Sequence, residues 1–452
     1  MDYKGKKALV VGMARSGIAA ASLLLELGAS VTIYDAKPED SFAEGTFQAL
    51  LDGGAQSFLG KDPEGLVEEV DLLVLSPGVP LDLPFIRKAY KQKKIVMSEI
   101  ELGFDVAGAD FIAITGTNGK TTTTALTGEL FKNAGINTYV LGNIGVPITQ
   151  EALNIKKGDV VVAETAALQL DTIIGYQPKG SAILNITEDH MDRYGSMENY
   201  IAAKARIFKN QTKEDYCVLN QDNEIVRSLA PLISAKVLWF STEGPVLDGA
   251  YVEDGNIVYV EDGKKQVVVP TGELQIPGRH NLENALAATV LAMKYGISKE
   301  KAAHTLRTFT GVEHRLEMVR SLNGVTFIND SKGTNPDATI NAIRAMDRPT
   351  ILILGGFDKH GEFGPLFDAF TDNIKAVIIL GETTHKIVSA AKEAGFVKYI
   401  VANGFEDAVL KAYSLALDGD AVLLSPACAS WDMFRDFEER GDVFKKIVRG
   451  LT

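Results

Sequence analysis

The sequence is poor in cysteine and in basic residues, and each shortage excludes a class of protein. Only 2 of the 452 residues are cysteine, Cys217 and Cys428, which is too few for a disulfide scaffold or a cysteine-rich metal cluster. Lys and Arg total 46 against 59 acidic residues, a formal net charge of -13. Because nonspecific nucleic-acid binding requires a basic surface, we expect no nucleic-acid partner.

Long apolar runs are also missing. No uninterrupted apolar stretch approaches the roughly 18 residues that a membrane-spanning helix requires. The first residues, 1–5, lead straight into a strand pattern without the apolar core of a secretion signal. We therefore expect a cytoplasmic protein with no membrane partner. The length predicts about three domains of roughly 150 residues.

Short β-branched runs alternate with amphipathic segments and glycine turns along most of the chain, which is typical of parallel sheets with crossover helices. Asp-Gly pairs at 248–249, 254–255 and 262–263 predict hairpin turns, and hence a small antiparallel appendage between residues 241 and 277. The predicted strands are 7–11, 30–34, 71–75 and 94–97, then 111–115, 137–141, 159–163, 181–185 and 215–220, and finally 350–354, 375–380, 398–402 and 421–425.

A first glycine loop, Gly12-Met13-Ala14-Arg15-Ser16-Gly17, follows the first strand and precedes a predicted helix over 18–27, and Asp35 ends the next strand. This layout predicts a diphosphate at the amides of the helix N-terminus. Ala14 replaces the middle glycine of the dinucleotide fingerprint, and a glycine turn that only permits strand–helix packing remains an alternative. Ser76-Pro77-Gly78 follows the third strand and could form a second wall of the same crevice.

A second glycine loop, Gly116-Thr117-Asn118-Gly119-Lys120-Thr121, lies between a hydrophobic strand and a helix predicted from Thr122. Such loops wrap backbone amides around a triphosphate, while the lysine reaches the β- and γ-phosphates and the threonine hydroxyl binds Mg²⁺. Ile114 stands where the strict pattern has a glycine, so this is a shortened variant. A nicotinamide dehydrogenase, which the first loop alone would suggest, leaves this loop unexplained.

Polar side chains follow the strands around this second loop. Asn143, Glu164 and Asp189-His190 come after successive predicted strands, Glu164 directly so, and ligands bind at such strand ends in open parallel sheets. Glu164 is a natural Mg²⁺ ligand, and His190 could bind metal or act as a general acid–base group. Lys204 lies on a predicted helix, and its spacing alone predicts a surface lysine.

Several longer motifs resemble those of the Mur ligase family. They are the second glycine loop, Gly142-Asn143-Ile144-Gly145, residues 185–192, His280-Asn281-Leu282-Glu283-Asn284-Ala285, His314-Arg315, residues 329–335, residues 355–359 and residues 424–430. The resemblance covers essentially the whole chain. It implies three α/β domains, each a mostly parallel sheet with crossover helices: a Rossmann-like UDP-substrate domain (1–99), a P-loop ATPase-like domain (100–311) and a Rossmann-like amino-acid domain (312–452).

Within this family the chain most resembles the member that adds D-glutamate to UDP-N-acetylmuramoyl-L-alanine in cytoplasmic peptidoglycan precursor synthesis. The resemblance implies an ATP-dependent ligase: a substrate carboxylate takes the γ-phosphoryl group, and the amine of D-glutamate attacks the resulting acyl phosphate. The implied substrates are ATP and these two small molecules, the implied cofactor is Mg²⁺ as two ions, and we expect a monomer.

The resemblance also implies a role for individual residues. The catalytic set is Lys120, Glu164, His190, Lys204, Lys332 and Lys359. The ATP-binding set is Gly116, Thr117, Asn118, Gly119, Lys120, Thr121, Thr122, Asn281, Asn284, Arg315 and Asp330. The UDP-substrate set is Arg15, Ser16, Asp35, Lys37, Gly78, Asn143 and His190. The D-glutamate set is Thr334, Lys359, Ser430 and Phe437. The metal ligands are Thr121, Glu164, His190 and Lys204, the last as a carbamylated lysine.

One segment departs from the family pattern. Family members usually carry Ser-Ser-Phe-Gln after the metal-binding glutamate, whereas this chain has Glu164-Thr165-Ala166-Ala167-Leu168-Gln169. The loss motivates one alternative, a nucleotide-sensing or regulatory protein of the same fold with weakened turnover. A sibling ligase is the other alternative, but folylpolyglutamate synthases lack a UDP-binding first domain, and the Asp-Asn-Pro-Arg motif of the diaminopimelate-adding enzyme is absent here.

Overall fold

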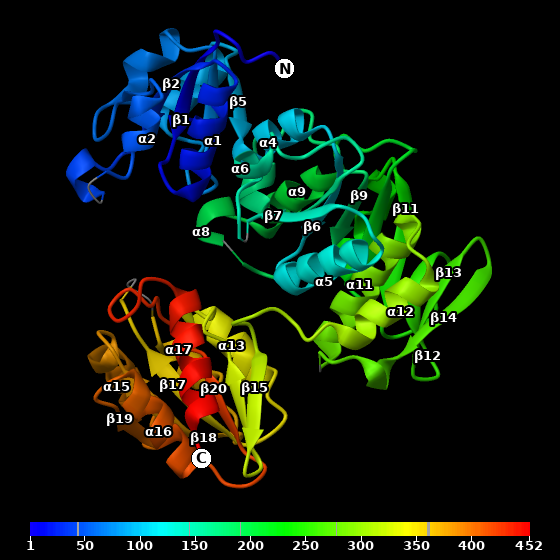
Figure 1. Cartoon of the computed structure of the whole chain (residues 1–452), viewed down its shortest axis with the longest axis vertical. Coiled ribbons are helices and arrows are strands. Elements are labelled where there is room, and N and C mark those ends of the chain that lie inside the picture. Colours follow the sequence, from blue (N-terminus) through cyan, green and yellow to red (C-terminus); the bar gives the residue numbers. More distant parts are fainter. Residues whose placement is uncertain (43–44, 144, 190, 277, 359–361) are drawn as a thin grey trace. The chain divides into compact units, whose positions relative to one another are not determined.

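The computed structural model describes residues 1–42, 45–143, 145–189, 191–276, 278–358 and 362–452. The chain forms two compact units, Met1–Phe309 and Thr310–Thr452. The first unit contains two sheets and the second contains one (Figure 1). All three sheets are mostly parallel with crossover helices, which confirms the predicted fold class. The limits predicted for the three domains stay predictions.

The first sheet has five parallel strands in the order β3-β2-β1-β4-β5. Successive residues of β1 point to opposite faces, so Ala8 and Val10 join one hydrophobic core while Leu9 and Val11 join another. Both faces are therefore buried under helices, as a parallel sheet requires. The strands are β1 (Lys7–Val11), β2 (Ser30–Tyr34), β3 (Gln56–Ser57), β4 (Leu72–Leu75) and β5 (Ile95–Ser98). The helices are α1 (Arg15–Glu26), η1 (Glu39–Ser41), α2 (Gln48–Asp52), η2 (Pro63–Glu68), α3 (Pro84–Lys91) and α4 (Glu99–Ala107).

The second sheet has nine strands in the order β14-β13-β12-β11-β10-β9-β6-β8-β7. Its strands are β6 (Asp110–Thr115), β7 (Thr138–Gly142), β8 (Val160–Glu164), β9 (Gly180–Ile183), β10 (Tyr216–Asn220), β11 (Lys236–Ser241), β12 (Gly249–Glu253), β13 (Asn256–Glu261) and β14 (Lys264–Pro270). Its longer helices are α5 (Lys120–Asn133), α9 (Met197–Ala205), α11 (Arg279–Tyr295) and α12 (Lys299–Thr308). The shorter ones are α6 (Ile148–Glu151), α7 (Ala167–Leu170), α8 (Met191–Tyr194), η3 (Arg206–Phe208), α10 (Glu224–Ser228), η4 (Ala230–Leu232) and η5 (Thr271–Glu273).

The predicted antiparallel appendage is present, and it extends this second sheet (Figure 1). Asp254 and Gly255 have φ of 47° and 73° between β12 and β13, and Asp262 and Gly263 have 49° and 75° between β13 and β14. Two successive left-handed residues are typical of type I′ hairpin turns. The hairpin predicted at Asp248-Gly249 is wrong, because β11 and β12 pair in parallel.

The third sheet has six strands in the order β15-β16-β20-β17-β18-β19. Its strands are β15 (Glu317–Leu322), β16 (Val325–Asn329), β17 (Thr350–Gly355), β18 (Ile374–Leu380), β19 (Tyr399–Val401) and β20 (Ala421–Leu424). Its helices are α13 (Pro336–Arg344), α14 (Gly364–Asp368), α15 (Thr384–Glu393), α16 (Phe405–Leu415) and α17 (Phe437–Gly450). The antiparallel β15–β16 pair was not predicted from the sequence.

Most predicted strands agree with the structure to within a residue or two. Strands 7–11 and 30–34 coincide with β1 and β2. The strand predicted over 181–185 instead ends at Ile183, because the Asn185 carbonyl and side chain bond to the second glycine loop. Both helices after the glycine loops begin earlier than predicted, at Arg15 and at Lys120.

Candidate active site

The first glycine loop lies between β1 and α1 and contacts the ends of β2 and β4. The Met13 amide donates a 2.8 Å hydrogen bond to Asp35 Oδ2, and Ser76 Oγ donates a 2.6 Å bond to the Gly12 carbonyl. Gly17 packs so closely that an added Cβ would lie 1.9 Å from the Gly12 oxygen. The loop is therefore locked to both neighbouring strand ends.

The other residues predicted for the UDP-substrate side lie around this loop. Arg15 and Ser16 are the first two residues of α1. The Lys37 amide donates to Asp35 Oδ1 at 3.0 Å, and Gly78 follows Ser76 in the exposed turn after β4. The structure thus brings these first-domain residues to one edge of the first sheet.

The second glycine loop joins β6 to α5 and has the left-handed backbone that its glycines permit. Gly119 has φ of 85°, and an added Cβ there would lie 2.3 Å from Asn284 Oδ1. Lys120 Nζ donates to the carbonyls of Gly116 at 2.9 Å and Thr117 at 2.8 Å. Thr122 is the third residue of α5 and is buried. The Lys120 side chain therefore folds back over the loop, with its ammonium against the loop carbonyls.

A network from the loop after β9 holds the second glycine loop in place. The Asn118 amide donates to Asn185 Oδ1 at 2.8 Å, and Asn185 Nδ2 donates back to the Asn118 carbonyl at 3.1 Å. The Thr187 amide donates to Thr117 Oγ1 at 3.1 Å. Asn185 was not predicted as a site residue, although its place after a strand beside the loop was the available signal.

Glu164 connects the second glycine loop to the loop after β7. It lies opposite Ile114 of β6 and Gly142 of β7 in the strand register. Thr121 Oγ1 donates to Glu164 Oε2 at 2.8 Å, and Asn143 Nδ2 donates to Glu164 Oε1 at 2.8 Å. The carboxylate is only 2% exposed. One carboxylate and one hydroxyl are thus adjacent, and oxygen donors of this kind suit Mg²⁺.

Lys204 is buried, so the surface position predicted from its spacing is wrong. Its side chain is 1% exposed because α9 turns it inward with Tyr200 and Ala203. Lys204 Nζ donates to the Gly116 carbonyl at 2.9 Å and lies 4.5 Å from the centre of the Tyr200 ring. Burial, and then the charge of Lys120, lower the pKa of Lys204 well below its usual value. Burial therefore makes the neutral amine easier to form here than on an exposed lysine.

Asn281 and Asn284, predicted to bind adenine, lie on the first turns of α11 beside α5. Thr123 Oγ1 donates to Asn284 Oδ1 at 3.1 Å, and Asn284 Nδ2 donates to Asn281 Oδ1 at 3.3 Å. The structure thus places both asparagines next to the second glycine loop. His190 and Lys359 lie outside the described residues, and their predicted roles stay predictions.

In the second unit, the described site residues follow β16 and β20 or begin α17, except Arg315, which lies two residues before β15. Ser425 Oγ donates to Asp330 Oδ2 at 2.6 Å, and burial raises the pKa of Asp330 to about 6. The neighbouring Arg315 charge partly offsets this rise in the pKa. Lys332 Nζ lies 5.7 Å from the centre of the Phe437 ring. Thr334 is half-buried, and Ser430 is 2% exposed.

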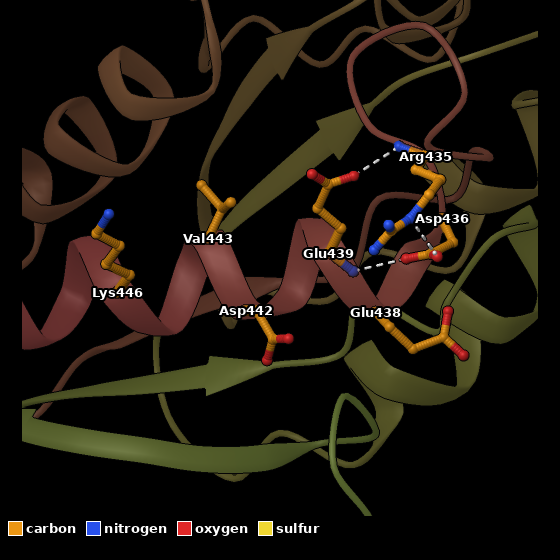
Figure 2. A pocket seen from close by; sticks show the side chains of 7 residues that line it. All are labelled: Arg435, Asp436, Glu438, Glu439, Asp442, Val443 and Lys446. Atoms are coloured by element: carbon orange, nitrogen blue, oxygen red, sulfur yellow. Dashed lines mark hydrogen bonds and ion pairs between the residues drawn. The ribbon is translucent and has the colours of Figure 1, made fainter.

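A cavity of about 300 Å³ lies elsewhere in the second unit, beside the first turns of α17 (Figure 2). The Arg435 amide donates to Glu439 Oε2 and the Glu439 amide to Asp436 Oδ1, both at 2.8 Å. These bonds cap α17, and none of the predicted site residues lines the cavity. Its lining residues are Arg435, Asp436, Glu438, Glu439, Asp442, Val443 and Lys446.

Two kinds of site are therefore built at strand ends: a glycine loop facing Asp35, and a phosphate-type loop facing Glu164. Among the described residues, no three His, Cys, Asp or Glu side chains gather into a metal site. The predicted ligand set is of a different kind, since it includes a hydroxyl and a modified lysine. No helix in the described part of the chain is long and apolar enough to cross a bilayer.

Comparison with known proteins identifies the family of this three-part α/β chain. The family model for the Mur ligase MurD-like N-terminal domain matches residues 6–98. The Mur ligase middle domain matches residues 114–292, and the Mur ligase glutamate ligase domain matches residues 314–428. The chain belongs to the Mur ligase family.

Its curated relatives cover its whole length. A UDP-N-acetylmuramoylalanine--D-glutamate ligase from Alkaliphilus oremlandii is 46% identical over 455 residues, covering 100% of both chains. The protein of the same name from Clostridioides difficile is 47% identical over 452 residues, again covering 100% of both.

The solved structures share the fold. UDP-N-acetylmuramate-alanine ligase MurC from Thermotoga maritima has a TM-score of 0.60 at 20% identity, covering 98% of this chain and 99% of that one. A MurF ligase from the same organism, solved in complex with ADP, has a TM-score of 0.56 at 16% identity, covering 99% and 96%. Both agree with the three-sheet architecture.

Proposed function

We propose that this protein catalyses the ATP-dependent addition of D-glutamate to UDP-N-acetylmuramoyl-L-alanine, a step of peptidoglycan precursor synthesis. The observation that carries the proposal is the full-length identity of 46–47% to ligases named for this reaction. The family model for the glutamate ligase domain, at residues 314–428, supports the choice of amino acid.

The reaction has two steps. A carboxylate oxygen of UDP-N-acetylmuramoyl-L-alanine attacks the γ-phosphorus of ATP, and the bond to the β-phosphate oxygen breaks, which releases ADP and leaves an acyl phosphate. The amine nitrogen of D-glutamate then attacks the acyl carbon. The tetrahedral intermediate loses a proton from nitrogen and expels inorganic phosphate, which leaves the amide. Both steps bring anions together, so the site must supply positive charge.

Residues of the first unit hold the nucleotide and the first substrate in this proposal. The loop residues Gly116, Thr117, Asn118 and Gly119 surround the phosphates, and Lys120 neutralises the phosphate charge. Its ammonium already points at the loop, at 2.9 Å from the Gly116 carbonyl, so a bound phosphate would replace this carbonyl contact. Asn281 and Asn284 bind adenine, and Asn143 contacts the muramoyl side. The first glycine loop, with Arg15 and Asp35, holds the UDP group.

The donor set around Glu164 fits Mg²⁺. Thr121 and Glu164 supply a hydroxyl and a carboxylate oxygen within hydrogen-bond distance of each other, and Mg²⁺ favours such oxygen ligands. When bound, Mg²⁺ draws the phosphate oxygens together and neutralises developing charge. We propose a second ion held by His190 and a carbamylated Lys204.

Lys204 has the properties that carbamylation requires. Burial lowers the pKa of its ammonium, and the neutral amine is the form that attacks carbon dioxide. The carbamate would be an anion beside the Lys120 ammonium, where a charged Lys204 ammonium is repelled. The buried position and the 2.9 Å bond to the Gly116 carbonyl support this proposal, because the new carboxylate would lie beside the phosphate loop.

Residues of the second unit receive the amino acid in this proposal. Lys332, Thr334, Lys359, Ser430 and Phe437 surround D-glutamate and the reacting carbon. Arg315 and Asp330 contact the nucleotide, Asp330 through the ribose. Because ATP and UDP-sugars are cytoplasmic metabolites, we propose that the protein acts in the cytoplasm, and as a monomer.

The presence of Ala166-Ala167 in place of the family's two serines is compatible with the proposed ligase function. The Ala166 amide donates to Gln169 Oε1 at 2.9 Å, and Ala167 packs in the hydrophobic core. The turn after β8 therefore forms α7 without the two family hydroxyls. No observation favours the regulatory alternative over the ligase.

Product analysis by mass spectrometry tests the proposal. The purified protein is incubated with ATP, Mg²⁺, D-glutamate and UDP-N-acetylmuramoyl-L-alanine, and the expected product is the substrate joined to one glutamate by an amide. Lys120→Ala should form none, whereas Lys132→Ala, which removes an exposed lysine of the same helix, should behave as wild type. A wild-type protein that binds ATP but forms no product would instead favour the regulatory alternative.

A further inference from the structure

Arg440 is a fully buried arginine on α17 of the second unit, with an exposed fraction of 0%. Its hydrogen-bond acceptors are neutral oxygens. Nε donates to Ser331 Oγ at 2.9 Å and Nη2 to the Ser331 carbonyl at 2.7 Å. Nη1 donates to the carbonyls of Cys428 at 3.0 Å and Ala429 at 3.2 Å. Burying a guanidinium without a hydrogen-bonded carboxylate is costly, so the arrangement calls for a compensating role.

The partners of Arg440 belong to two loops that carry predicted D-glutamate contacts. Ser331 follows β16 and precedes Lys332, and Cys428 and Ala429 follow β20 and precede Ser430. Ser331 Oγ also donates to the Phe437 carbonyl at 2.8 Å. One guanidinium therefore fixes the backbone immediately before two of the predicted contacts, and through Ser331 it reaches a third.

A third loop, after β17, packs against the same group. An added Cβ at Gly356 would lie 2.2 Å from the Ala429 carbonyl oxygen and 3.3 Å from Arg440 Nη1. Phe357 and Ala429 form an isolated β-bridge, in which the Phe357 amide donates to the Ala429 carbonyl at 2.9 Å. Arg440 thus lies beneath the loops that follow β16, β17 and β20.

We propose that Arg440 is a positioning residue that sets the geometry of the amino-acid site by holding these three loop backbones to one planar group. This inference rests on the proposed function. A guanidinium suits the task because its five N–H donors diverge in one plane and reach several carbonyls at once. A lysine ammonium is a point donor and cannot span the Ser331 and Ala429 oxygens together. Displacements of about 1 Å in such positions can cost on the order of 100-fold in rate.

Steady-state kinetics of Arg440→Lys test the proposal. We expect the KM for D-glutamate to rise at least about tenfold. The KM values for ATP and UDP-N-acetylmuramoyl-L-alanine should change less than about twofold, because most of the contacts proposed for these two substrates belong to the first unit. Phe444→Leu is the matched control. It alters a fully buried residue of the same helix, in the core between α17 and the sheet, and should lower the melting temperature without this selective change in KM.

The outcomes separate the inference from the function on which it rests. An inactive wild type would overturn the proposed function. An active wild type with an unchanged D-glutamate KM in Arg440→Lys would overturn only the positioning role, as would equal changes in all three KM values. If Arg440→Lys fails to fold, Ser331→Ala decides, since it removes only the Nε acceptor and the bond to Phe437. A selective rise in the D-glutamate KM supports the role, and no rise refutes it.

Discussion

The hydroxyl of Thr121 and the carboxylate of Glu164 are joined by a 2.8 Å hydrogen bond, although they lie 43 positions apart in the sequence. Thr121 is the second residue of α5 and Glu164 ends β8, so the bond joins the phosphate loop to the neighbouring strand end. These two oxygen atoms are close enough to bind one Mg²⁺ together, and in the proposed reaction that ion binds the triphosphate here.

Glu164→Gln should lower ATP-dependent phosphate release by roughly 100-fold or more, because the amide keeps the size of the side chain but loses the negative charge that holds Mg²⁺. Titration of the rate with Mg²⁺ should show a higher half-saturating concentration. Glu129→Gln, which changes an exposed glutamate of α5, is the control and should leave both values unchanged. Wild-type rates in Glu164→Gln would exclude Glu164 as a metal ligand.

Lys204→Ala should be nearly inactive, and short carboxylic acids such as acetate should partly restore its activity. The reason is that the buried position beside the Gly116 carbonyl would receive the added carboxylate in place of the carbamate. The measurement is phosphate release with and without the acid, with Lys209→Ala as a control outside α9. Full activity of Lys204→Ala without any acid would count against a metal-binding carbamate.

Asp35→Ala should weaken binding of the UDP-substrate while leaving the KM for ATP nearly unchanged. Asp35 accepts hydrogen bonds from the Met13 and Lys37 amides, so its loss frees the first glycine loop without touching the second. Steady-state KM values for both substrates check this, and Asp40→Ala, at an exposed position in η1, is the control. A defect confined to ATP would reverse the assignment of the two glycine loops.

Asp330 predicts a pH dependence of ATP binding. Burial raises its pKa from 3.8 to about 6, and the proposed ribose contact requires the ionised carboxylate. The KM for ATP should therefore rise as the pH falls through about 6. Asp330→Asn should bind ATP more weakly at high pH and lack this component, so the ratio of the two KM values isolates it from the titration of ATP itself. A ratio that does not change with pH would refute the contact.

The raised pKa of Asp330 has the opposite effect on stability: low pH weakens the proposed ATP contact but favours the folded protein. Because the folded protein holds this proton more tightly than the unfolded chain, the contribution of Asp330 to the free energy of unfolding is fully present below pH 3.8. It is lost as the pH rises through about 6. Nucleotide binding and stability thus place opposing demands on this carboxylate, as is common at functional sites.

Local patterns predicted most of the fold. Strand limits such as those of β1 and β2 followed from hydrophobic runs between glycine turns, and the Asp-Gly turns at 254–255 and 262–263 followed from their need for left-handed backbone. The hairpin predicted at Asp248-Gly249 was wrong because an Asp-Gly pair indicates only that the backbone can turn there. It does not indicate which strands pair with each other. The β15–β16 pair was not predicted, although Asn323-Gly324 forms its turn with left-handed backbone, φ being 50° and 78°.

The site was predictable only where chemistry leaves a local motif. The second glycine loop and Glu164 carried such a signal. The burial of Lys204 depends on which face of α9 packs inward, and the role of Arg440 depends on three loops that are distant in sequence. Tyr200 was also missed, although its position one helical turn before Lys204 was a signal that two side chains share a face.

Phosphate release measured with ATP, Mg²⁺ and UDP-N-acetylmuramoyl-L-alanine, in the presence of D-glutamate, L-glutamate or no amino acid, tests the central claim most directly. We expect sustained release only with D-glutamate, matched by an equal amount of ligated product. Equal release with both isomers, or no release under any condition by a protein that still binds ATP, would contradict it.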